Sequence, residues 1–510
     1  QHYFDLLARY TRIDKVNLPK SGQEAWLAKL SQDYDLILVG LHQGSMLSPE
    51  WLTELAANPK CILSVFYNKE EVLDPKMLAA GKTLLSVPEI PWAASVASQI
   101  VFGALEAVGS GLTTTALNRL AYAPPVWAGI DAKLLSDSIR SIVEEGIAAQ
   151  AFPGAQVLVA KNGTVIYHET FGYHTYENER EVKPGDLYDF ASLTKVTSGL
   201  PVLMKLYGEG KFDLDARLEE YYPDFKGSNK GHLSFRSMLS HNARLMPWIP
   251  YWQGTLKGNA RYPWRKRWDA NRINDYRFRN KTFSRDSSET YPIKIAADLW
   301  QHKDYRKKMF KAIRKSPLNE KPGYVYSGLL FYLLPDIIAN LVDTDDFETY
   351  IKDEIYRKIG AWTITYNPTR FYPLEQIIPT ERDTFFSLQQ IHGRVHDEGA
   401  AMMGGVSCNA GLFATTTDLA KLMQLYLNKG NFGGQQIIAS EAVDTFITCH
   451  YCGEGNFRGI GFDKPLIKFD PAVSSISKDA GASSFGHSGY TGTFAWADPE
   501  SGVLFIFMSN

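Results

Sequence analysis

The chain has 510 residues, of which 45% are hydrophobic and 22% charged, and its formal net charge at pH 7 is −2. A chain of this length and composition is expected to fold into two or three domains, each with a sizeable core. The near-zero net charge argues against binding to nucleic acid or to acidic partners through overall charge. The longest apolar stretch, Trp92–Leu112, contains Glu106 and many small residues, so we expect a packed helix and no membrane span.

Residues 1–110 alternate strand-like and helix-like segments. Short apolar runs at 35–41, 61–66 and 83–87 have the pattern of strands buried on both faces. Helix-like segments lie at 25–30 and from Pro49 onwards. Strands that alternate with helices predict a parallel α/β layer, which we expect to be a separate domain.

Gly-, Thr- and Pro-rich residues at 111–126 indicate a linker, and residues 127–510 are expected to form the second domain. A predicted helix over 131–148 precedes a hairpin that turns at Asn162-Gly163, and another hairpin closes the sequence at 493–508. We expect these first and last strands to pair in one antiparallel sheet, with helices between them. The whole chain is therefore predicted to be multidomain, a partial α/β domain followed by an α+β domain.

Residues 251–315 form an insertion of unusual composition, with 18 Lys and Arg against 6 Asp and Glu and several aromatic residues. Three interpretations stay open. The segment could be a solvated or domain-packing insertion, a lid that attracts anionic fragments, or a nucleic-acid-binding element. The aromatic residues form no known nucleic-acid motif, so we expect no nucleic-acid partner.

Two helices of the second domain carry local signals. The helix after Ser192 contains Pro201, which removes one backbone hydrogen bond and should bend the helix past its second turn. A helix over 419–427 is expected to be capped by Thr417-Asp418. The sequence has no signal peptide, yet it begins in a helix-like segment and ends in a strand. We therefore expect a piece of a longer protein, whose compartment this absence does not indicate.

Ser192-Leu193-Thr194-Lys195 is the motif that carries most chemical information. It opens a predicted helix, so Lys195 lies on the same face as Ser192 with its amine within reach of the serine oxygen. A serine hydroxyl becomes a good nucleophile only beside a base or a cation. Ser475-Ile476-Ser477-Lys478 repeats the spacing, but too little chain follows it to complete a site.

Two later segments complete the predicted site. Tyr326-Ser327-Gly328 would supply a second acid–base group. The glycine-rich run that begins at Gly486 would bring a strand edge close to the substrate. There the main-chain N–H of Tyr490, together with that of Ser192, would form an oxyanion hole.

The four cysteines indicate little. Cys449 and Cys452 form a lone C-x-x-C without a second pair, which makes a zinc site unlikely by spacing and leaves a local disulfide or two free thiols. Cys408 is expected to be a small core residue. We expect neither a metal nor another cofactor.

These motifs resemble those of the serine β-lactamase and penicillin-binding-protein superfamily, in particular its class C-like branch with D-amino-acid peptidases and esterases. The resemblance runs from about residue 126 to the end and includes 152–155, 236–241 and 410–414. It implies that Ser192 is the acylated nucleophile, Lys195 its activator and Tyr326 the proton shuttle. His487 stands where the family has Lys or His.

Further residues follow from the same resemblance. Ser192, Ser488, Gly489 and Tyr490 would bind the oxyanion and the substrate. His396, followed by Asp397, either lines the pocket or forms a structural pair. Where the family has Tyr-x-Asn this chain has Gly328, so the side-chain amide that would donate to a substrate amide carbonyl is missing. A His487 that is mostly neutral at pH 7 would also hold a substrate carboxylate less firmly than lysine does.

Residues 1–110 resemble the end of the C-terminal α/β domain of family 3 glycoside hydrolases, through the three strands and 97–103. The barrel that carries that family's nucleophile is not in this sequence, so we assign this domain no glycosidase chemistry. A β-N-acetylglucosaminidase-like half beside a peptide-cleaving half suggests peptidoglycan fragments as substrates, in the periplasm or cell envelope. A small-ester hydrolase and a catalytically degenerate muropeptide-binding module are the alternatives.

Overall fold

The computed structural model describes residues 2–16, 23–42, 49–67, 84–88, 92–108, 113–114, 118–257 and 278–510. The chain forms two compact units, 1–122 and 123–510, which are treated separately below. No helix within the described ranges combines the length and apolar character needed to cross a bilayer. Residues 43–48, just before the helix predicted from Pro49 onwards, and residues 258–277 of the basic insertion lie outside the described residues.

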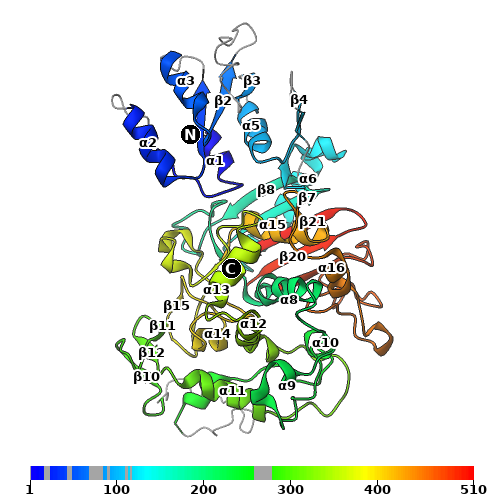
Figure 1. The fold of residues 1–510 in the computed structure, drawn as a ribbon. Helices are drawn as coiled ribbons and strands as arrows, with labels where there is room; N and C mark the ends of the chain where they lie inside the picture. The colour runs from blue at the N-terminus through cyan, green and yellow to red at the C-terminus, as the bar shows by residue number, and fades with distance from the viewer. Residues whose placement is uncertain are drawn as a thin grey trace. The chain divides into compact units, whose positions relative to one another are not determined.

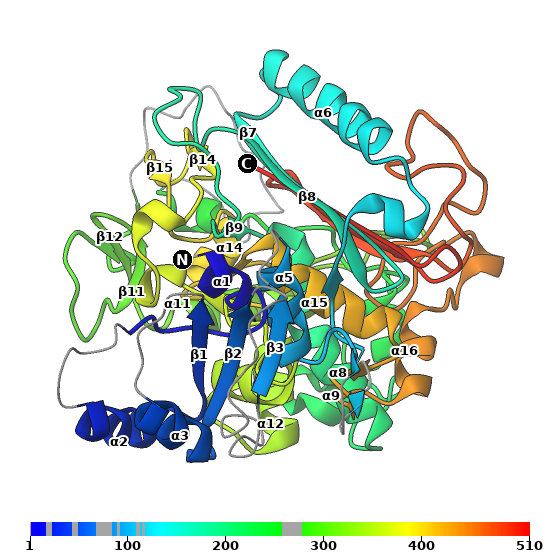
Figure 2. The same ribbon diagram turned by 90° about the horizontal axis from the view of Figure 1, so that it is seen from above.

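The first unit contains the predicted parallel layer. Strands β1 (Ile37–His42), β2 (Cys61–Tyr67) and β3 (Leu84–Pro88) lie side by side in this order, and both neighbouring pairs are parallel (Figure 2). The helices are α1 (His2–Leu7), α2 (Gln23–Asp33), α3 (Pro49–Ala57) and α5 (Ala93–Val101). The helix expected over 92–112 is therefore shorter than predicted, and the two-residue strand β4 (Ala107–Val108) follows it.

The core of this unit is aromatic. Tyr3 and Leu7 of α1 pack with Phe66 of β2 and with Ala93 and Ala97 of α5. The Tyr3 hydroxyl also hydrogen-bonds Ser64 Oγ at 2.6 Å, so the polar end of this buried ring is satisfied. Short strands β5 (Thr113–Thr114) and β6 (Ala121–Tyr122) complete the described part of the unit.

The second unit is built on an antiparallel sheet. Its strands run in the order β19 (Phe485–Gly489), β20 (Thr493–Asp498), β21 (Val503–Ser509), β7 (Gly154–Lys161), β8 (Thr164–Gly172). The predicted pairing of first and last strands is confirmed, because β21 pairs with β7 from Val503↔Lys161 to Ser509↔Ala155. The tight turn between β7 and β8 uses left-handed residues, Asn162 at φ 49° and Gly163 at φ 77°.

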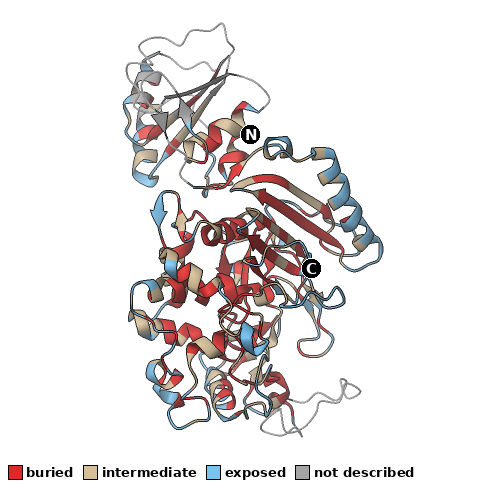
Figure 3. Cartoon of the chain, turned by 90° about the vertical axis from the view of Figure 1, so that its right-hand side faces the viewer, coloured by how far each residue is buried: buried red, intermediate tan, exposed pale blue. Residues whose placement is uncertain are grey.

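A helix covers each face of this sheet. On one face α6 (Ala132–Ala148), capped by Asp131, buries Val143 against β7 and β8. On the other lies α15 (Thr416–Leu427), which contacts β7, β20 and β21. Figure 2 shows the two helices on opposite sides of the strands, and Figure 3 shows that the outer side of α6 is exposed while the sheet is buried.

The cap predicted for α15 was wrong, and the helix begins three residues before the predicted start at Leu419. The helix starts at Thr416, and Thr415 Oγ1 accepts the N–H of Asp418. The Asp418 carboxylate instead accepts from the Thr363 hydroxyl at 2.7 Å and pairs with Lys421 at 2.7 Å. A side chain that binds another segment of the fold is not available to cap its own helix.

A helical region lies at the end of the unit away from the sheet (Figure 1). Its helices are α8 (Gly199–Gly208), α9 (Leu218–Tyr221), α10 (Phe235–Leu239), α11 (Tyr305–Lys315), α12 (Leu334–Val342), α13 (Phe347–Ile351), α14 (Glu398–Met402) and α16 (Ser440–Ile447). The small strand pairs are β9 (Tyr188–Asp189) and β13 (Thr365–Tyr366) on β16 (Leu412–Ala414), β14 (Glu381–Arg382) on β15 (Gln390–Ile391), and β17 (Asn431–Phe432) on β18 (Gln435–Gln436).

The described part of the basic insertion is folded onto this region. Strands β10 (Phe283–Ser284), β12 (Leu299–Gln301) and β11 (Ile293–Ala296) form a small sheet, and α11 buries Tyr305, Met309 and Ile313. Gln301 donates to the carbonyl of Met402 at 2.7 Å. These contacts are those of a packing element, and a role as a lid stays a prediction.

Candidate active site

Ser192 lies in a tight turn between β9 and α7 (Thr194–Thr197). The helix expected to begin at Ser192 begins instead with a 3₁₀ turn, Ala191–Leu193. Ala191 has φ 43°, a left-handed conformation that non-glycine residues rarely adopt. Its N–H donates to Asp189 Oδ1 at 2.8 Å, so the side chain of β9 fixes the turn that presents the serine.

The helix after Ser192 is broken, as Pro201 predicted, but earlier than expected. It ends at Thr197 and resumes at Gly199, with Ser198 at φ −106° and ψ −101°. Pro201 has no N–H for the carbonyl of Thr197, and the Tyr356 hydroxyl donates to this oxygen at 2.7 Å. The break therefore leaves no unsatisfied carbonyl at Thr197.

Lys195 contacts the serine as predicted. Its Nζ donates to Ser192 Oγ at 3.0 Å and to the carbonyl of Asn409 at 3.0 Å, and the side chain is 1% exposed. The ammonium group also lies 5.2 Å from the ring centre of Tyr326. The structure thus brings the Ser192–Lys195 pair together with Tyr326 and Asn409, which are distant from it in the sequence.

Tyr326 is held by its neighbours in the chain. The Ser327 hydroxyl donates to the carbonyl of Met246 at 2.6 Å, and the N–H of Ser327 donates to Nδ1 of His241 at 3.1 Å. The rings of Tyr326 and His241 lie 4.6 Å apart. Within the described residues the Tyr326 hydroxyl is buried without a hydrogen-bond partner, and it can therefore exchange a proton with a substrate group without breaking an existing bond.

Strand β19 lies directly against the turn that carries Ser192. A Cβ on Gly489 would come within 2.4 Å of the Phe190 carbonyl and 2.1 Å of Thr493 Oγ1, so only glycine fits. Ser488 precedes it, and the side chain of Tyr490, just after it, is 83% exposed. Strand β19 therefore packs tightly on this turn, and the oxyanion hole of the Ser192 and Tyr490 N–H groups stays a prediction.

His487 is neutral at pH 7. Burial, assisted by the charges of Arg458 and Lys195, lowers the pKa of His487 to about 4, and its side chain is 2% exposed. Its Nδ1 lies 2.6 Å from the carbonyl of Ser488, so Nδ1 carries the proton and donates. The remaining Nε2 can only accept, which is unlike the cation that the corresponding family lysine would provide.

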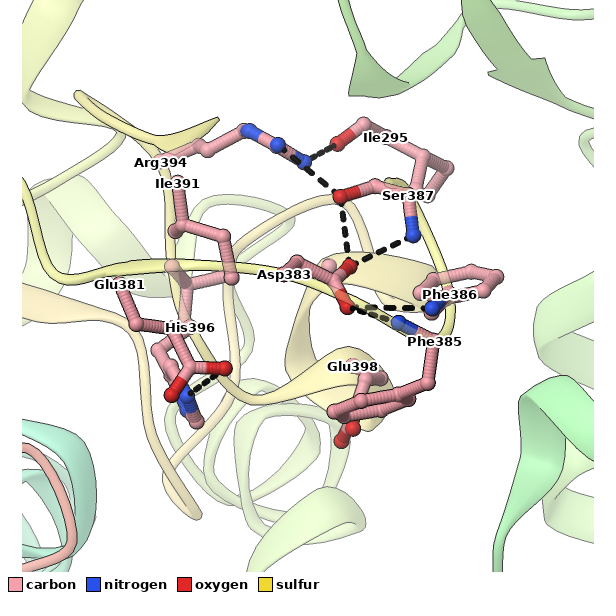
Figure 4. Close-up of a pocket in the computed structure, with 12 residues that line it drawn as sticks. Ile295, Glu381, Asp383, Phe385, Phe386, Ser387, Ile391, Arg394, His396 and Glu398 are labelled. Carbon is pink, nitrogen blue, oxygen red and sulfur yellow. Dashed lines mark hydrogen bonds and ion pairs between the residues drawn. The ribbon is translucent and has the colours of Figure 1, made fainter. Parts of the chain in front are cut away.

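His396 lies beside Tyr490, with ring centres 5.4 Å apart. Burial lowers the pKa of His396, but the hydrogen bond to Glu381 at 3.1 Å and the charge of Asp189 outweigh it and raise this pKa to about 9. His396 also lines a small pocket with Glu381, Asp383, Arg394 and Glu398 (Figure 4), and neither Ser192 nor Lys195 nor Tyr326 is among its lining residues. A place for His396 in the substrate pocket therefore stays a prediction.

Asp189 is a site residue that the sequence did not single out. Its Oδ1 holds Ala191, its Oδ2 accepts the N–H of His396 at 2.6 Å, and its carbonyl accepts the Thr491 hydroxyl at 2.7 Å. It therefore joins the nucleophile turn, the His396 loop and the turn after β19. Burial raises the pKa of Asp189 to about 6.

The cysteines do not contribute to the site. Cys449 and Cys452 form a local disulfide, which decides between the two alternatives left by the sequence. Cys408 is fully buried and packs against Gly199, as expected of a core residue. Ser475 and Lys478 of the second Ser-x-x-Lys lie in an exposed loop.

The chain is similar in sequence to curated bacterial proteins. It is 28% identical over 433 residues to a protein of Escherichia coli K12 provisionally named D-alanyl-D-alanine carboxypeptidase, covering 81% of this chain and 90% of that protein. A protein of Salmonella enteritidis with the same provisional name is 26% identical, covering 77% and 86%.

Solved structures share the fold at low sequence identity. A penicillin-binding protein homologue from Caulobacter crescentus superposes with a TM-score of 0.51 at 18% identity, over 73% of this chain and 91% of that one. EstCE1, a hydrolase with promiscuous acyltransferase activity, gives a TM-score of 0.52 at 16% identity, over 74% and 93%. Residues 139–510 match the Beta-lactamase family. The chain belongs to the Beta-lactamase family and is a serine hydrolase.

Proposed function

We propose that the protein hydrolyses D-amino-acid peptides derived from peptidoglycan, or related amides and esters, through an acyl-Ser192 intermediate. The observation that carries this proposal is the 3.0 Å contact between Ser192 Oγ and Nζ of Lys195, a residue that is 1% exposed. The provisional carboxypeptidase names of the relatives support the peptide class.

The proposed reaction has two steps, acylation of Ser192 and hydrolysis of the acyl-enzyme, and Lys195 and Tyr326 transfer protons in both. Ser192 Oγ attacks the substrate carbonyl as Lys195 takes its proton, and the main-chain N–H groups of Ser192 and Tyr490 stabilise the oxyanion. Tyr326 delivers a proton to the leaving amine and is reprotonated by Lys195, which holds the serine proton. Water then attacks the acyl carbonyl and gives its proton to Tyr326 and Lys195. The same pair returns a proton to Ser192 Oγ as the acid is released.

We propose also that residues 1–110 are the end of a family 3 glycoside hydrolase C-terminal-like domain, 111–126 a linker and 127–510 the hydrolase domain. The three parallel strands of the first unit support this. The proposal places the protein in the periplasm or cell envelope, where peptidoglycan fragments occur. A family 3 barrel encoded upstream in the full-length gene would support it, and an unrelated upstream domain would contradict it.

The reaction is tested by incubating the protein with diacetyl-L-Lys-D-Ala-D-Ala and measuring released D-alanine by mass spectrometry, with Ser192→Ala alongside. Release by the wild type and none by the variant supports the proposal. Hydrolysis of p-nitrophenyl acetate without release of D-alanine would favour the small-ester hydrolase. Saturable binding of the peptide without turnover of either substrate would favour the degenerate binding module.

A further inference from the structure

Asn409 lies one hydrogen bond from the catalytic pair. Its main-chain carbonyl accepts from Lys195 Nζ, and its side chain is 6% exposed. It precedes β16 and is more than two hundred residues from Lys195 in sequence, with a separation of 214. No spacing signal in the sequence connects the two residues.

A polar network fixes the orientation of the Asn409 carboxamide. Its Nδ2 donates to Tyr332 Oη at 3.0 Å and to Asp397 Oδ2 at 3.3 Å, and the Tyr332 hydroxyl donates to Asp397 Oδ1 at 2.9 Å. An ionised carboxylate only accepts hydrogen bonds. The Tyr332 proton is therefore used on Asp397, its oxygen accepts from Asn409, and the amide cannot be turned over without losing both bonds.

The opposite atom of this amide, Oδ1, faces Gly328. A Cβ built on Gly328 would lie 2.3 Å from Asn409 Oδ1, so the oxygen occupies the space that a side chain at this position would need. Gly328 is two residues after Tyr326. Within the described residues no group donates to Oδ1. This oxygen is not fully buried, so solvent or a ligand can reach it.

We propose that Asn409 Oδ1 is a fixed hydrogen-bond acceptor for an N–H of the substrate next to the scissile bond. Asn409 would then favour amide over ester substrates, because an amide offers an N–H to Oδ1 where an ester offers only an oxygen lone pair. A site built to hydrogen-bond one group rejects an analogue that lacks it. This inference rests on the proposed peptide hydrolysis, and it does not replace the donor expected to be missing at Gly328, because Asn409 Nδ2 already donates to Tyr332 and Asp397.

The test compares diacetyl-L-Lys-D-Ala-D-Ala with two analogues. In one, an ester oxygen replaces the N–H of the first D-Ala, and in the other it replaces the N–H of the second D-Ala, which is part of the scissile bond. The ratio of kcat/KM between the peptide and each analogue is measured for the wild type and for Asn409→Ala. We expect the variant to lower at least one ratio about tenfold. Ratios that both stay within about twofold of the wild type would overturn the proposal.

Two tyrosine variants separate orientation from packing. Tyr332→Phe removes the hydroxyl that fixes the amide and should lower the same ratio, by less than Asn409→Ala does. Tyr251→Phe removes a neighbouring buried hydroxyl that has no hydrogen-bond partner in the described residues, and should leave the ratio unchanged. Equal effects of the two tyrosine variants would contradict the proposal. Labelling of Ser192 by a fluorophosphonate in every variant reports on the acyl-enzyme separately.

Discussion

The two sides of Ser192 differ in how far their polar groups are satisfied. On the lysine side, Nζ of Lys195 has two acceptors, and Asn409 is held by Tyr332 and Asp397. On the tyrosine side, several buried polar atoms have no partner within the described residues: Tyr326 Oη, His241 Nε2, His487 Nε2 and Arg458 Nε. The first side is formed before any substrate binds, whereas the second is completed by substrate or water.

This difference indicates where binding energy is available. A buried polar atom without a partner costs about 1–3 kcal/mol, which a correctly placed ligand group recovers. The guanidinium of Arg458 lies 5.3 Å from the Tyr326 ring centre and is paired with Asp463, so it keeps a positive charge beside these atoms. The tyrosine side therefore suits a polar, partly anionic group, although His487 itself is neutral.

Breaking the satisfied side should have the largest effect. Lys195→Met removes the proton acceptor from Ser192 and is expected to lower kcat/KM about 10⁴-fold. The measurement is the rate of fluorophosphonate labelling and of D-alanine release. Lys478→Met, in the exposed second Ser-x-x-Lys, is the matched control and should label at the wild-type rate. A Lys195→Met protein that still labels within tenfold of the wild type would show that another group activates Ser192.

On the tyrosine side, Tyr326→Phe is expected to lower kcat/KM about 10²–10³-fold, because the hydroxyl transfers the proton to the leaving group. The hydroxyl has no hydrogen bond to lose, so the unfolding temperature should not fall. Tyr324→Phe, two residues earlier and partly exposed, is the control for a general loss of aromatic hydroxyl groups. If the two variants lose activity equally, Tyr326 is not the proton shuttle.

Asp189→Asn tests how the turn that carries Ser192 is held. The variant should lower kcat/KM about tenfold at pH 8, because an amide cannot accept from the N–H groups of both Ala191 and His396 as a carboxylate does. Burial raises the pKa of Asp189 to about 6, so wild-type activity should fall as the pH falls through about 6. This acidic limb should be missing in the variant. An identical limb in both proteins would assign it to another group.

Stability should depend on pH in the opposite direction. Since the folded-state pKa of Asp189 is above its unfolded value of 3.8, the folded chain binds the proton more tightly. The resulting stabilisation is fully present below the unfolded pKa and is lost as the pH rises through about 6. Relative to Asp189→Asn, the wild type should therefore gain free energy of unfolding from pH 6 to pH 4, as measured in urea.

The smallest expected effect comes from Gly328→Ala. The new methyl group would displace Asn409 Oδ1, at an expected cost of about 1–3 kcal/mol in the free energy of unfolding. Asn409→Gly should remove the conflict, so the double variant should recover part of that loss. Thermal unfolding of the four proteins gives the coupling between the two sites. Additive losses would show that the side chains do not compete for the same space.

The sequence predicted the parts of the fold that local patterns determine. The parallel strands of the first unit, the turn at Asn162-Gly163 and the pairing of β7 with β21 were all predicted correctly. The contact of Lys195 with Ser192 followed from helical spacing. The starts of helices were predicted least accurately, as the cap of α15 and the start of the helix at Ser192 show. Partners that are distant in the sequence decide where these helices begin.

The contacts that Asp189 makes with the Ser192 turn and that Asn409 makes with Lys195 were not predicted. Asp189 stands in an apolar run and Asn409 in a glycine-rich one, and neither residue type nor spacing connects them with Ser192. Their roles depend on the His396 loop, on Tyr332 and on β19, which the fold brings to the same place. The space beside Gly328 is occupied by Asn409 Oδ1, an acceptor and not the donor expected to be missing there.

The most direct test of the central claim is the intact mass of the protein after exposure to a fluorophosphonate, with Ser192→Ala and Ser475→Ala alongside. The account predicts one adduct on the wild type and on Ser475→Ala, and none on Ser192→Ala. An absence of adduct on folded wild-type protein, or an adduct that survives in Ser192→Ala, would contradict the claim that Lys195 activates Ser192.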